Sequence, residues 1–254
     1  MSNEIEQRRK LILSAEEQMA AMSRRSLLWA AGAVAASYGG WRWLLSQPKQ
    51  DRLLSPLRKA LEFNESVWAT KISNDKLAPE FDKSLAKEPK PNGIEGLSND
   101  YDFSSWNLKV ELSSSDKNPR LYSLDQLKQL PKTEMVTEFK CVEGWSQVVH
   151  WAGVRLSDFI ATLPPQNAKN LYMATPDEKY FVGIDMPSAM HPQTLLAYEM
   201  NGAPLTPIHG APLRLVTALK YGYKSIKRLG YIRFMQNRAP DFWTEYQYDW
   251  FAGH

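Results

Sequence analysis

The 254-residue sequence has only one cysteine, Cys141, and only four histidines. A single thiol excludes an intrachain disulfide and every zinc or iron–sulfur site that needs several cysteine ligands. The histidines, at positions 150, 191, 209 and 254, show neither H-x-x-x-H nor H-E-x-x-H spacing. A metal held by protein ligands alone is therefore not expected. The sequence also lacks a G-x-G-x-x-G loop, a Walker A loop and an internal repeat.

A strong overall charge is missing as well, since the net charge is +3. With no recognisable nucleic-acid motif, binding to DNA or RNA is not expected. Hydrophobic residues make up 43% of the chain and aromatic residues 11%, which is enough for a full-sized core. The length suits one large domain with an appended segment. We expect a signal or membrane anchor with its linker at residues 1–50 and the main domain at residues 51–254.

The N-terminal segment resembles a twin-arginine export signal. Arg24 and Arg25 precede an apolar run over residues 26–45, which is about long enough to span a bilayer core of roughly 30 Å. Five basic residues precede this run, which favours a cytoplasmic N-terminus: Arg8, Arg9, Lys10, Arg24 and Arg25. Three fates of this segment remain open. It is cleaved after the small residues 33–35, it is kept as a membrane anchor, or it is an ordinary buried helix of the domain. The order of these features predicts a protein on the periplasmic side of the bacterial inner membrane.

The body of the chain reads as an α+β fold with several short strands and few long helices. Strand-like patterns occupy residues 106–112, 133–141, 170–175, 211–219 and 227–236. Helices are predicted within residues 54–71, 123–130, 155–163 and 192–200, the second beginning with a serine N-cap. Residues 78–100 are rich in Pro, Lys, Asn and Gly and predict an extended surface segment.

A basic segment without acidic residues lies between Glu199 and Asp241. It contains His209, Arg214, Lys220, Lys224, Lys227, Arg228, Arg233 and Arg238, interrupted by Gly, Pro and Tyr. Small residues let the backbone approach a ligand, while Arg, Lys and backbone N–H groups bind phosphate oxygens. The segment therefore predicts loops that wrap an anion, although a solvated basic face is the commoner meaning of such a run.

Three roles remain open for Cys141 on physical grounds. A free cysteine is most often a buried small hydrophobe. A nucleophile paired with His150 is weakly supported, because catalytic partners are usually remote in sequence. A soft thiolate can also ligate a metal that arrives inside an organic cofactor, and this role needs only one protein sulfur.

Three stretches resemble the sulfite-oxidase-fold molybdopterin enzymes, in the same order and at matching spacing: "FKCVEGWSQVVHWAGVRLSDFI", "LLAYEMNGAPLTPIHGAPLRLV" and "KYGYKSIKRLGYI". The branch they resemble most is that of the bacterial periplasmic protein-methionine-sulfoxide reductase catalytic subunits. The resemblance covers roughly residue 64 to the C-terminus. It implies a sulfite-oxidase-type molybdopterin-binding fold and a Mo-molybdopterin cofactor.

The same resemblance implies that Cys141 is the catalytic thiolate ligand of molybdenum. Residues implied to contact the pterin cofactor are Asn64, Val67, Trp68, Thr175, His209, Arg214, Ser225, Ile226 and Lys227. Val67 and Trp68 differ in type from the branch, and His209 stands where the branch has an asparagine. His150 replaces a proline of the branch, and we consider it as a proton relay, with a satisfied structural histidine as the alternative.

The expected activity is oxygen-atom transfer, most readily the reduction of a methionine-type sulfoxide. Electrons would come from a membrane haem b or quinone-linked partner, or from a soluble carrier, because C-x-x-C-H haem attachment is impossible with one cysteine. Oxidation of sulfite or a related anion is the enzymatic alternative, with Lys140 and Arg228 as anion-binding candidates. Trp145 and Trp151 are the candidates for the more apolar pocket of a sulfoxide reductase. A non-catalytic, membrane-tethered subunit is the alternative from another class.

Overall fold

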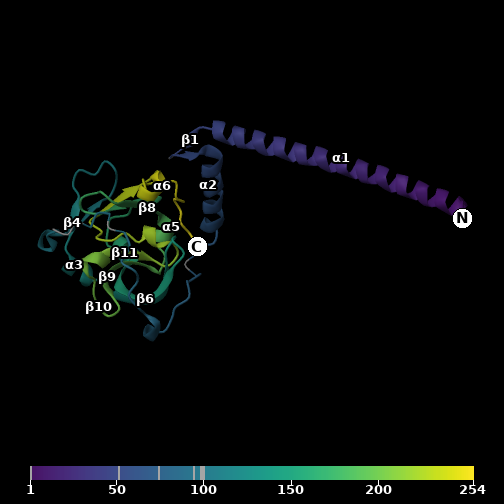
Figure 1. Ribbon diagram of the computed structural model, residues 1–254. Coiled ribbons are helices and arrows are strands. Elements are labelled where there is room, and N and C mark those ends of the chain that lie inside the picture. Colours follow the sequence, from purple (N-terminus) through teal and green to yellow (C-terminus); the bar gives the residue numbers. More distant parts are fainter. Residues whose placement is uncertain (1, 51, 74, 94, 98–100) are drawn as a thin grey trace. The chain divides into compact units, whose positions relative to one another are not determined.

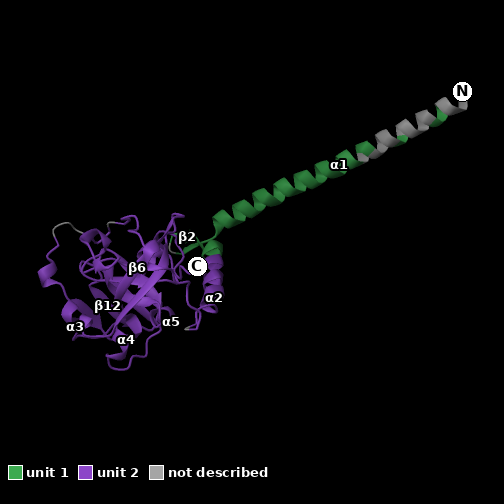
Figure 2. Cartoon of the chain, turned by 90° about the horizontal axis from the view of Figure 1, so that it is seen from below, with its two compact units in different colours: residues 1–58 green, residues 59–254 purple. Residues whose placement is uncertain are grey.

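The computed structural model describes residues 2–50, 52–73, 75–93, 95–97 and 101–254, which form two compact units (Figure 2). The first unit comprises residues 1–58 and the second residues 59–254. The units divide within helix α2 (Ser55–Ala69). The predicted organisation into a targeting segment at residues 1–50 and a domain at residues 51–254 stays a prediction.

The first unit is dominated by helix α1 (Ser2–Ser46), which is followed by the antiparallel pair β1 (Lys49–Gln50) and β2 (Leu53–Leu54) (Figure 1). The apolar stretch of α1 includes Gly39, Gly40 and the charged Arg42, which lower its suitability for a bilayer core. Among the described residues, no helix combines the length and the apolar character that a membrane crossing requires. The predicted membrane anchor is thus not confirmed.

The second unit contains two five-stranded sheets, so the predicted mixture of helix and sheet is confirmed. The first sheet consists of β5 (Lys132–Lys140), β6 (Ser146–Arg155), β9 (Thr194–Met200), β10 (Ala203–Pro204) and β11 (Arg214–Thr217). All its pairings are antiparallel, and β9 contacts β6, β10 and β11. The second sheet has the order β4 (Arg120–Tyr122), β3 (Leu108–Glu111), β12 (Tyr231–Met235), β7 (Asn170–Ala174), β8 (Phe181–Asp185). Its pairing of β3 with β12 is parallel.

Short helices lie between, before and after these strands. They are α3 (Leu124–Lys128), α4 (Leu156–Ala161), α5 (Met186–Ala189) and α6 (Phe242–Glu245), with single 3-10 turns η1 (Lys83–Leu85), η2 (Phe103–Ser105), η3 (Pro207–His209) and η4 (Gly222–Lys224). The predicted serine cap is confirmed, because the hydroxyl of Ser123 accepts a hydrogen bond from the backbone N–H of Gln126. In return, the backbone N–H of Ser123 donates to Oε1 of Gln126, which completes a capping box.

The helix predicted at residues 192–200 is wrong, because most of this stretch is strand β9. Six of the seven β9 residues are buried, since β6 and β11 flank the strand and side chains pack on both of its faces. A strand buried on both faces loses its alternating pattern, and a short apolar run cannot then be distinguished from a buried helix by periodicity.

The main core lies between the two sheets. Its buried residues include Leu108 and Met173 from the second sheet and Leu196 and Leu215 from the first. The opposite face of the first sheet carries a smaller cluster around Trp151 and Val216. Arg214 alternates with Leu215 along β11, and so it lies on this second face, beside the end of β5.

Candidate active site

Cys141 stands in the tight turn that joins β5 to β6. Its backbone N–H donates to the backbone oxygen of Trp145 at 2.9 Å, and its backbone oxygen accepts from the backbone N–H of Gly144 at 3.1 Å. Gly144 has φ +88°, a left-handed conformation that favours glycine. The turn closes directly beyond the last strand pair, Lys140 with Ser146. The half-buried, free thiol of Cys141 is thereby held at the edge of the first sheet.

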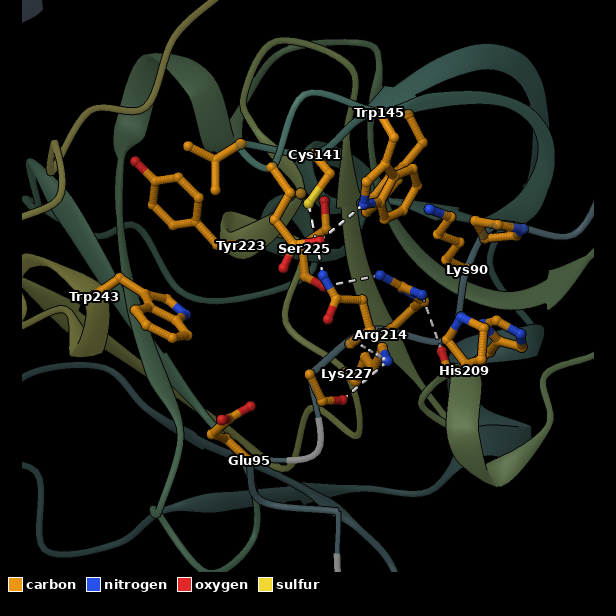
Figure 3. A pocket seen from close by; sticks show the side chains of 18 of the residues that line it. Lys90, Glu95, Cys141, Trp145, His209, Arg214, Tyr223, Ser225, Lys227 and Trp243 are labelled. Atoms are coloured by element: carbon orange, nitrogen blue, oxygen red, sulfur yellow. Dashed lines mark hydrogen bonds between the residues drawn. The ribbon is translucent and has the colours of Figure 1, made fainter.

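Cys141 lines a cavity of about 490 Å³ (Figure 3). Its other walls come from residues 89–93 and Glu95, from the turn that carries Trp145, from the segment 209–227 and from the C-terminal aromatic residues Trp243 and Tyr248. The basic segment and the only thiol of the chain therefore meet in one cavity, although the sequence separates them widely.

Arg214 contributes a buried cation to the cavity. Its Nη1 donates to the backbone oxygen of His209 and its Nη2 donates to the backbone oxygen of Ser225, both at 3.0 Å. The guanidinium also lies 4.8 Å from the ring centre of Trp151. Burial lowers the pKa of Arg214 to about 9, so the group stays charged at neutral pH. Its Nε has no hydrogen-bond partner among the described residues.

Ser225 and Lys227 lie beside this guanidinium. The hydroxyl of Ser225 is buried and has no partner within the part of the chain that the structure describes. Nζ of Lys227 donates to the backbone oxygens of Asn92 at 2.5 Å and Gly93 at 3.1 Å. Burial, and secondly the charge of Arg214, lower the pKa of Lys227 to about 8. Two neighbouring cations and unpaired buried polar atoms favour an anionic ligand.

His209 connects this cluster to the segment that precedes Asn92. Its Nε2 lies 2.7 Å from Oε1 of Glu88, and the imidazole is almost completely buried. Burial lowers the pKa of His209, the hydrogen bond to Glu88 raises it, and the charge of Arg214 lowers it again. The next residue, Gly210, has φ +98°, and a Cβ there would lie 2.7 Å from the Cβ of Lys227. Glycine thus permits the close approach of the two segments.

Asn92 is the residue that the sequence analysis missed. Its Nδ2 lies 3.7 Å from the sulfur of Cys141, and it lines the cavity. The run "KEPKPNG" at residues 87–93 could have indicated it, because two prolines and a glycine expose backbone oxygens and fix a loop. We interpreted that run only as surface.

Asn64, Val67 and Trp68 do not line the cavity. All three are on α2, where Asn64 and Val67 are exposed, and Trp68 lines a second, smaller hollow instead. The position beside the thiol belongs to Asn92 because residues 89–93 line the cavity, whereas α2 does not contribute to its lining.

Thr175 and Ile226 support the site from behind. Thr175 is fully buried and donates to Oδ1 of Asp177 at 2.6 Å, and a Cβ on Gly96 would lie 2.5 Å from its Cγ2. It therefore packs under the end of the loop that contains Glu95. The side chain of Ile226 belongs to the main core, so only its backbone is available to a ligand.

His150 lies on β6, outside the cavity lining. Its Nε2 is 3.2 Å from Oε2 of Glu134, and its backbone N–H donates to Asn201. Trp145 does line the cavity, whereas Trp151 is fully buried beneath Arg214.

The predicted anion-binding segment divides into two groups. Arg214 and Lys227 line the cavity. Other cations have carboxylate partners: Lys220 with Asp185 at 2.8 Å, Lys224 with Asp241 at 2.5 Å and Arg233 with Glu111 at 2.7 Å. The charge run alone could not separate ligand-binding cations from buried ion pairs.

The arrangement fits a group with a thiophilic metal at one end and an anion at the other. A half-buried thiol supplies a soft ligand. The unpaired Nε of Arg214 and hydroxyl of Ser225, with Lys227 beside them, offer donors to phosphate oxygens.

Comparison of the sequence with known proteins identifies its family. The family model described as "Oxidoreductase molybdopterin binding domain" matches residues 96–243. A protein of Azospira oryzae, provisionally named as the protein-methionine-sulfoxide reductase subunit YedZ1, is 31% identical over 78% of this chain and 76% of its own length. The protein-methionine-sulfoxide reductase catalytic subunit MsrP of Campylobacter jejuni is 30% identical over 76% of this chain and 71% of its own length.

Another MsrP, from Ralstonia nicotianae, is 28% identical over 94% of this chain and 72% of its own length. Among solved structures, the sulfane dehydrogenase SoxCD of Paracoccus pantotrophus aligns with a TM-score of 0.49 and 20% identity. That alignment covers 55% of this chain and 40% of the other, too slight a likeness to support an argument.

Proposed function

The chain belongs to the family of oxidoreductases with a molybdopterin-binding domain, and we propose that it reduces a sulfoxide of the methionine sulfoxide type. It is an enzyme, and its family implies a Mo-molybdopterin cofactor. When bound, this cofactor supplies two-electron oxygen-atom transfer. The sulfoxide loses its oxygen, takes up two electrons and two protons, and leaves as the sulfide with one water.

We propose specific roles for the residues around the cavity. The thiolate of Cys141 ligates molybdenum. The guanidinium of Arg214, the hydroxyl of Ser225 and the ammonium of Lys227 hold the phosphate of the cofactor, with the backbone of Ile226 between the last two. His209 and Thr175 act indirectly, since His209 fixes the loop at Glu88 and Thr175 packs beneath its other end.

The observation that carries the choice of substrate is the aromatic part of the lining of the cavity that contains Cys141. Trp145, Trp243 and Tyr248 give this cavity apolar aromatic surfaces, which suit the methyl and methylene groups of a methionine side chain. The cations considered for sulfite oxidation lie elsewhere. Lys140 contacts Glu138 and His254, and the guanidinium of Arg228 lies over the ring of Tyr101. The names of the relatives support the same substrate.

Electrons must reach the cofactor from another molecule, because the single cysteine excludes a C-x-x-C-H haem site. We propose a membrane haem b or quinone-linked protein, or a soluble carrier, as the donor. The twin-arginine-like sequence at Arg24 and Arg25 supports export by the twin-arginine machinery and work on the periplasmic side. Changing both arginines to lysine should leave the protein in the cytoplasm, and unchanged export would contradict this route.

The proton relay through His150 remains a proposal. Its imidazole contacts Glu134 rather than the cavity, so a relay needs further groups between them. The His150→Ala variant should alter the pH profile of turnover if the relay operates, and an unchanged profile would exclude it.

The deciding experiment compares two reactions in the molybdenum-loaded enzyme. Reduced methyl viologen is supplied with methionine sulfoxide, and ferricyanide is supplied with sulfite. We expect sulfoxide reduction to have the larger kcat/KM by a wide margin. Faster sulfite oxidation would assign the enzyme to the alternative chemistry. Protein without molybdenum, after maturation in a competent host, would favour the non-catalytic subunit.

A further inference from the structure

The pair Asn–Gly occurs twice in the sequence, at Asn92–Gly93 and at Asn201–Gly202. Asparagine is a heat-labile residue because the backbone nitrogen of the next residue can attack its side-chain amide and expel ammonia. A glycine in that next position has no Cβ to obstruct the attack. Both pairs are exposed, and neither glycine is crowded by the described residues: a Cβ at Gly93 would lie 3.4 Å from Oε2 of Glu95, and one at Gly202 would meet nothing within 4 Å. Their hydrogen bonds therefore decide which pair reacts.

Asn201 is held in the turn between β9 and β10. Its Oδ1 accepts a hydrogen bond from the backbone N–H of His150 at 3.1 Å, and its own backbone N–H donates to the backbone oxygen of His150 at 2.7 Å. The side-chain carbonyl must swing toward the nitrogen of Gly202 before that nitrogen can attack it. This movement breaks the bond to Oδ1, so the turn protects Asn201.

Asn92 is held differently. Its Nδ2 lies 3.7 Å from the sulfur of Cys141 and donates to the carboxylate of Glu143. Both contacts involve the nitrogen that leaves in the reaction. Among the described residues, neither Oδ1 of Asn92 nor the backbone N–H of Gly93 has a hydrogen-bond partner. The two groups that must move together are therefore free to do so.

Lys227 activates the nitrogen that attacks. This nitrogen belongs to the peptide between Asn92 and Gly93, and the carbonyl oxygen of the same peptide accepts a hydrogen bond from Nζ of Lys227 at 2.5 Å. The nitrogen attacks after losing its proton, and its negative charge then spreads to the carbonyl oxygen. An ammonium at this oxygen stabilises that charge in the manner of an oxyanion hole. In the part of the chain that the structure describes, no cation donates to the corresponding oxygen of Asn201.

We propose that Asn92 is a modification site, which deamidates spontaneously with the help of Lys227 and so ages the cofactor-free protein. The backbone nitrogen of Gly93 bonds to Cγ of Asn92, and the bond from Cγ to Nδ2 breaks. Nδ2 leaves as ammonia together with the proton of the Gly93 N–H. Water then opens the cyclic imide at either of its carbonyl groups and leaves an aspartate or an isoaspartate. No electron is transferred, and water is the co-reactant.

The product changes the cavity. An amide that faces the sulfur of Cys141 becomes a carboxylate, so a negative charge stands where the anionic cofactor must bind. A bound cofactor should in turn protect Asn92, because it fills the cavity that Asn92 and Gly93 line and engages the ammonium of Lys227. Chains that wait without cofactor then lose the ability to bind it. This consequence rests on the proposed function, whereas the chemistry at Asn92 does not.

Incubation in heavy-oxygen water tests the reaction directly. Cofactor-free wild-type protein, shown to be folded by a cooperative urea transition, is kept in mildly alkaline buffer and then digested for peptide mapping by mass spectrometry. Each deamidated residue gains one heavy oxygen, and labelling by an isoaspartyl methyltransferase identifies the isoaspartate. We expect Asn92 to convert at least about fivefold faster than Asn201, because breaking one hydrogen bond of typical net strength slows a reaction by roughly this factor. Equal rates, or an unlabelled Asn92, would overturn the proposal.

The cofactor-free Lys227→Met variant tests the activation. Conversion of Asn92 should slow by about tenfold or more, because a hydrogen bond to a charged group contributes at least that factor. The rate at Asn201 should stay the same, and it serves as an internal standard for folding. The matched control Lys90→Met removes a charge from the same loop, where the ammonium lies over the ring of Trp145, and should convert like wild type. Unchanged or faster conversion in Lys227→Met would show that the ammonium does not activate the site.

Retention of the cofactor tests the consequence. The Asn92→Asp variant should retain at least about fivefold less pterin and molybdenum than wild type, since two like charges about 4 Å apart repel by this factor even in water. Asn201→Asp adds the same charge at the β9–β10 turn and should retain the wild-type amount. Equal retention in both variants, or equal conversion of Asn92 with and without cofactor, would contradict the ageing role. Ageing as expected in an enzyme that binds the cofactor but does not reduce methionine sulfoxide would instead contradict the proposed function alone.

Discussion

Arg214 and Ser225 are joined by a hydrogen bond of 3.0 Å from Nη2 to the backbone oxygen, yet each retains one buried polar atom without a partner among the described residues. A buried donor without an acceptor costs free energy, roughly 1–3 kcal/mol for each group. Both residues also line the cavity that contains Cys141. An anion bound at this site would remove that cost, as the proposed cofactor role of these residues requires.

Replacing Arg214 by Met should weaken retention of the cofactor by about 10–100-fold, because a hydrogen bond to a charged group contributes roughly 1.5–3 kcal/mol. The measurement is pterin and molybdenum content after dialysis at defined protein concentration. Arg233→Met is the matched control, since Arg233 pairs with Glu111 away from the cavity. Equal cofactor loss in both variants would attribute the effect to general destabilisation.

Replacing Cys141 by Ser should separate metal ligation from cofactor retention. The serine oxygen has a similar size but lacks the soft thiolate that stabilises the metal. We expect turnover to fall by at least a hundredfold and the Mo(V) electron paramagnetic resonance to change. Pterin content should stay near the wild-type level, because Arg214 and Lys227 remain. An unchanged resonance would exclude Cys141 as the ligand.

Local patterns predicted much of the fold because several elements carry their own signals. The capping box at Ser123 and the strand-like run ending at Cys141 depend on neighbours in sequence, and both predictions are confirmed. The conformation of strand β9, which was predicted as a helix, is not determined by residues that are adjacent in sequence. Its conformation follows from flanking strands 40 or more residues away on one side, which no short window contains.

The site was predictable to the extent that it depends on residue type. The glycine-punctuated basic segment indicated loops around an anion, and the resemblance to the molybdopterin enzymes implied the metal-ligand role of the lone thiol; Arg214 and Lys227 do line one cavity with Cys141. Which cations pair with buried carboxylates depends on tertiary packing, as at Lys220. The choice of Asn92 over Asn64 likewise follows from the path of the loop and not from composition.

Stability should fall as the pH drops below about 6.5. Burial lowers the pKa values of His191, His209 and His254 in the folded protein, that of His254 to about 4. Below the unfolded pKa of about 6.5, the unfolded chain binds protons that the folded chain does not, so each histidine then favours unfolding. The loss is complete once the pH passes below the folded pKa.

The His254→Gln variant tests this dependence through urea unfolding of the cofactor-free protein. Between pH 6.5 and 5, its free energy of unfolding should decline less steeply than that of wild type. Between pH 7 and 8 the two proteins should show parallel pH dependence, because the histidine is neutral in both states. Parallel curves over the acidic range as well would show that His254 does not contribute.

The buried pair of Lys224 and Asp241 should make a large contribution to stability. Their charged atoms lie 2.5 Å apart with almost no exposure, and Lys224 also donates to the oxygen of Gly183 at 2.9 Å. Lys224→Met keeps a long, unbranched side chain at this position but leaves the carboxylate of Asp241 buried without its cation. Breaking one partner of such a pair costs about 3–5 kcal/mol, mostly through the uncompensated charge.

Urea unfolding of cofactor-free Lys224→Met measures that cost, with Lys179→Met as the control. Lys179 lies 3.7 Å from Asp177 but is 75% exposed, so water replaces its contact and no measurable change is expected. The double variant Lys224→Met, Asp241→Asn should recover part of the lost stability, because it removes the buried charge together with its partner. If the single and double variants are equally unstable, the loss comes from packing around Trp250 rather than from an unpaired carboxylate.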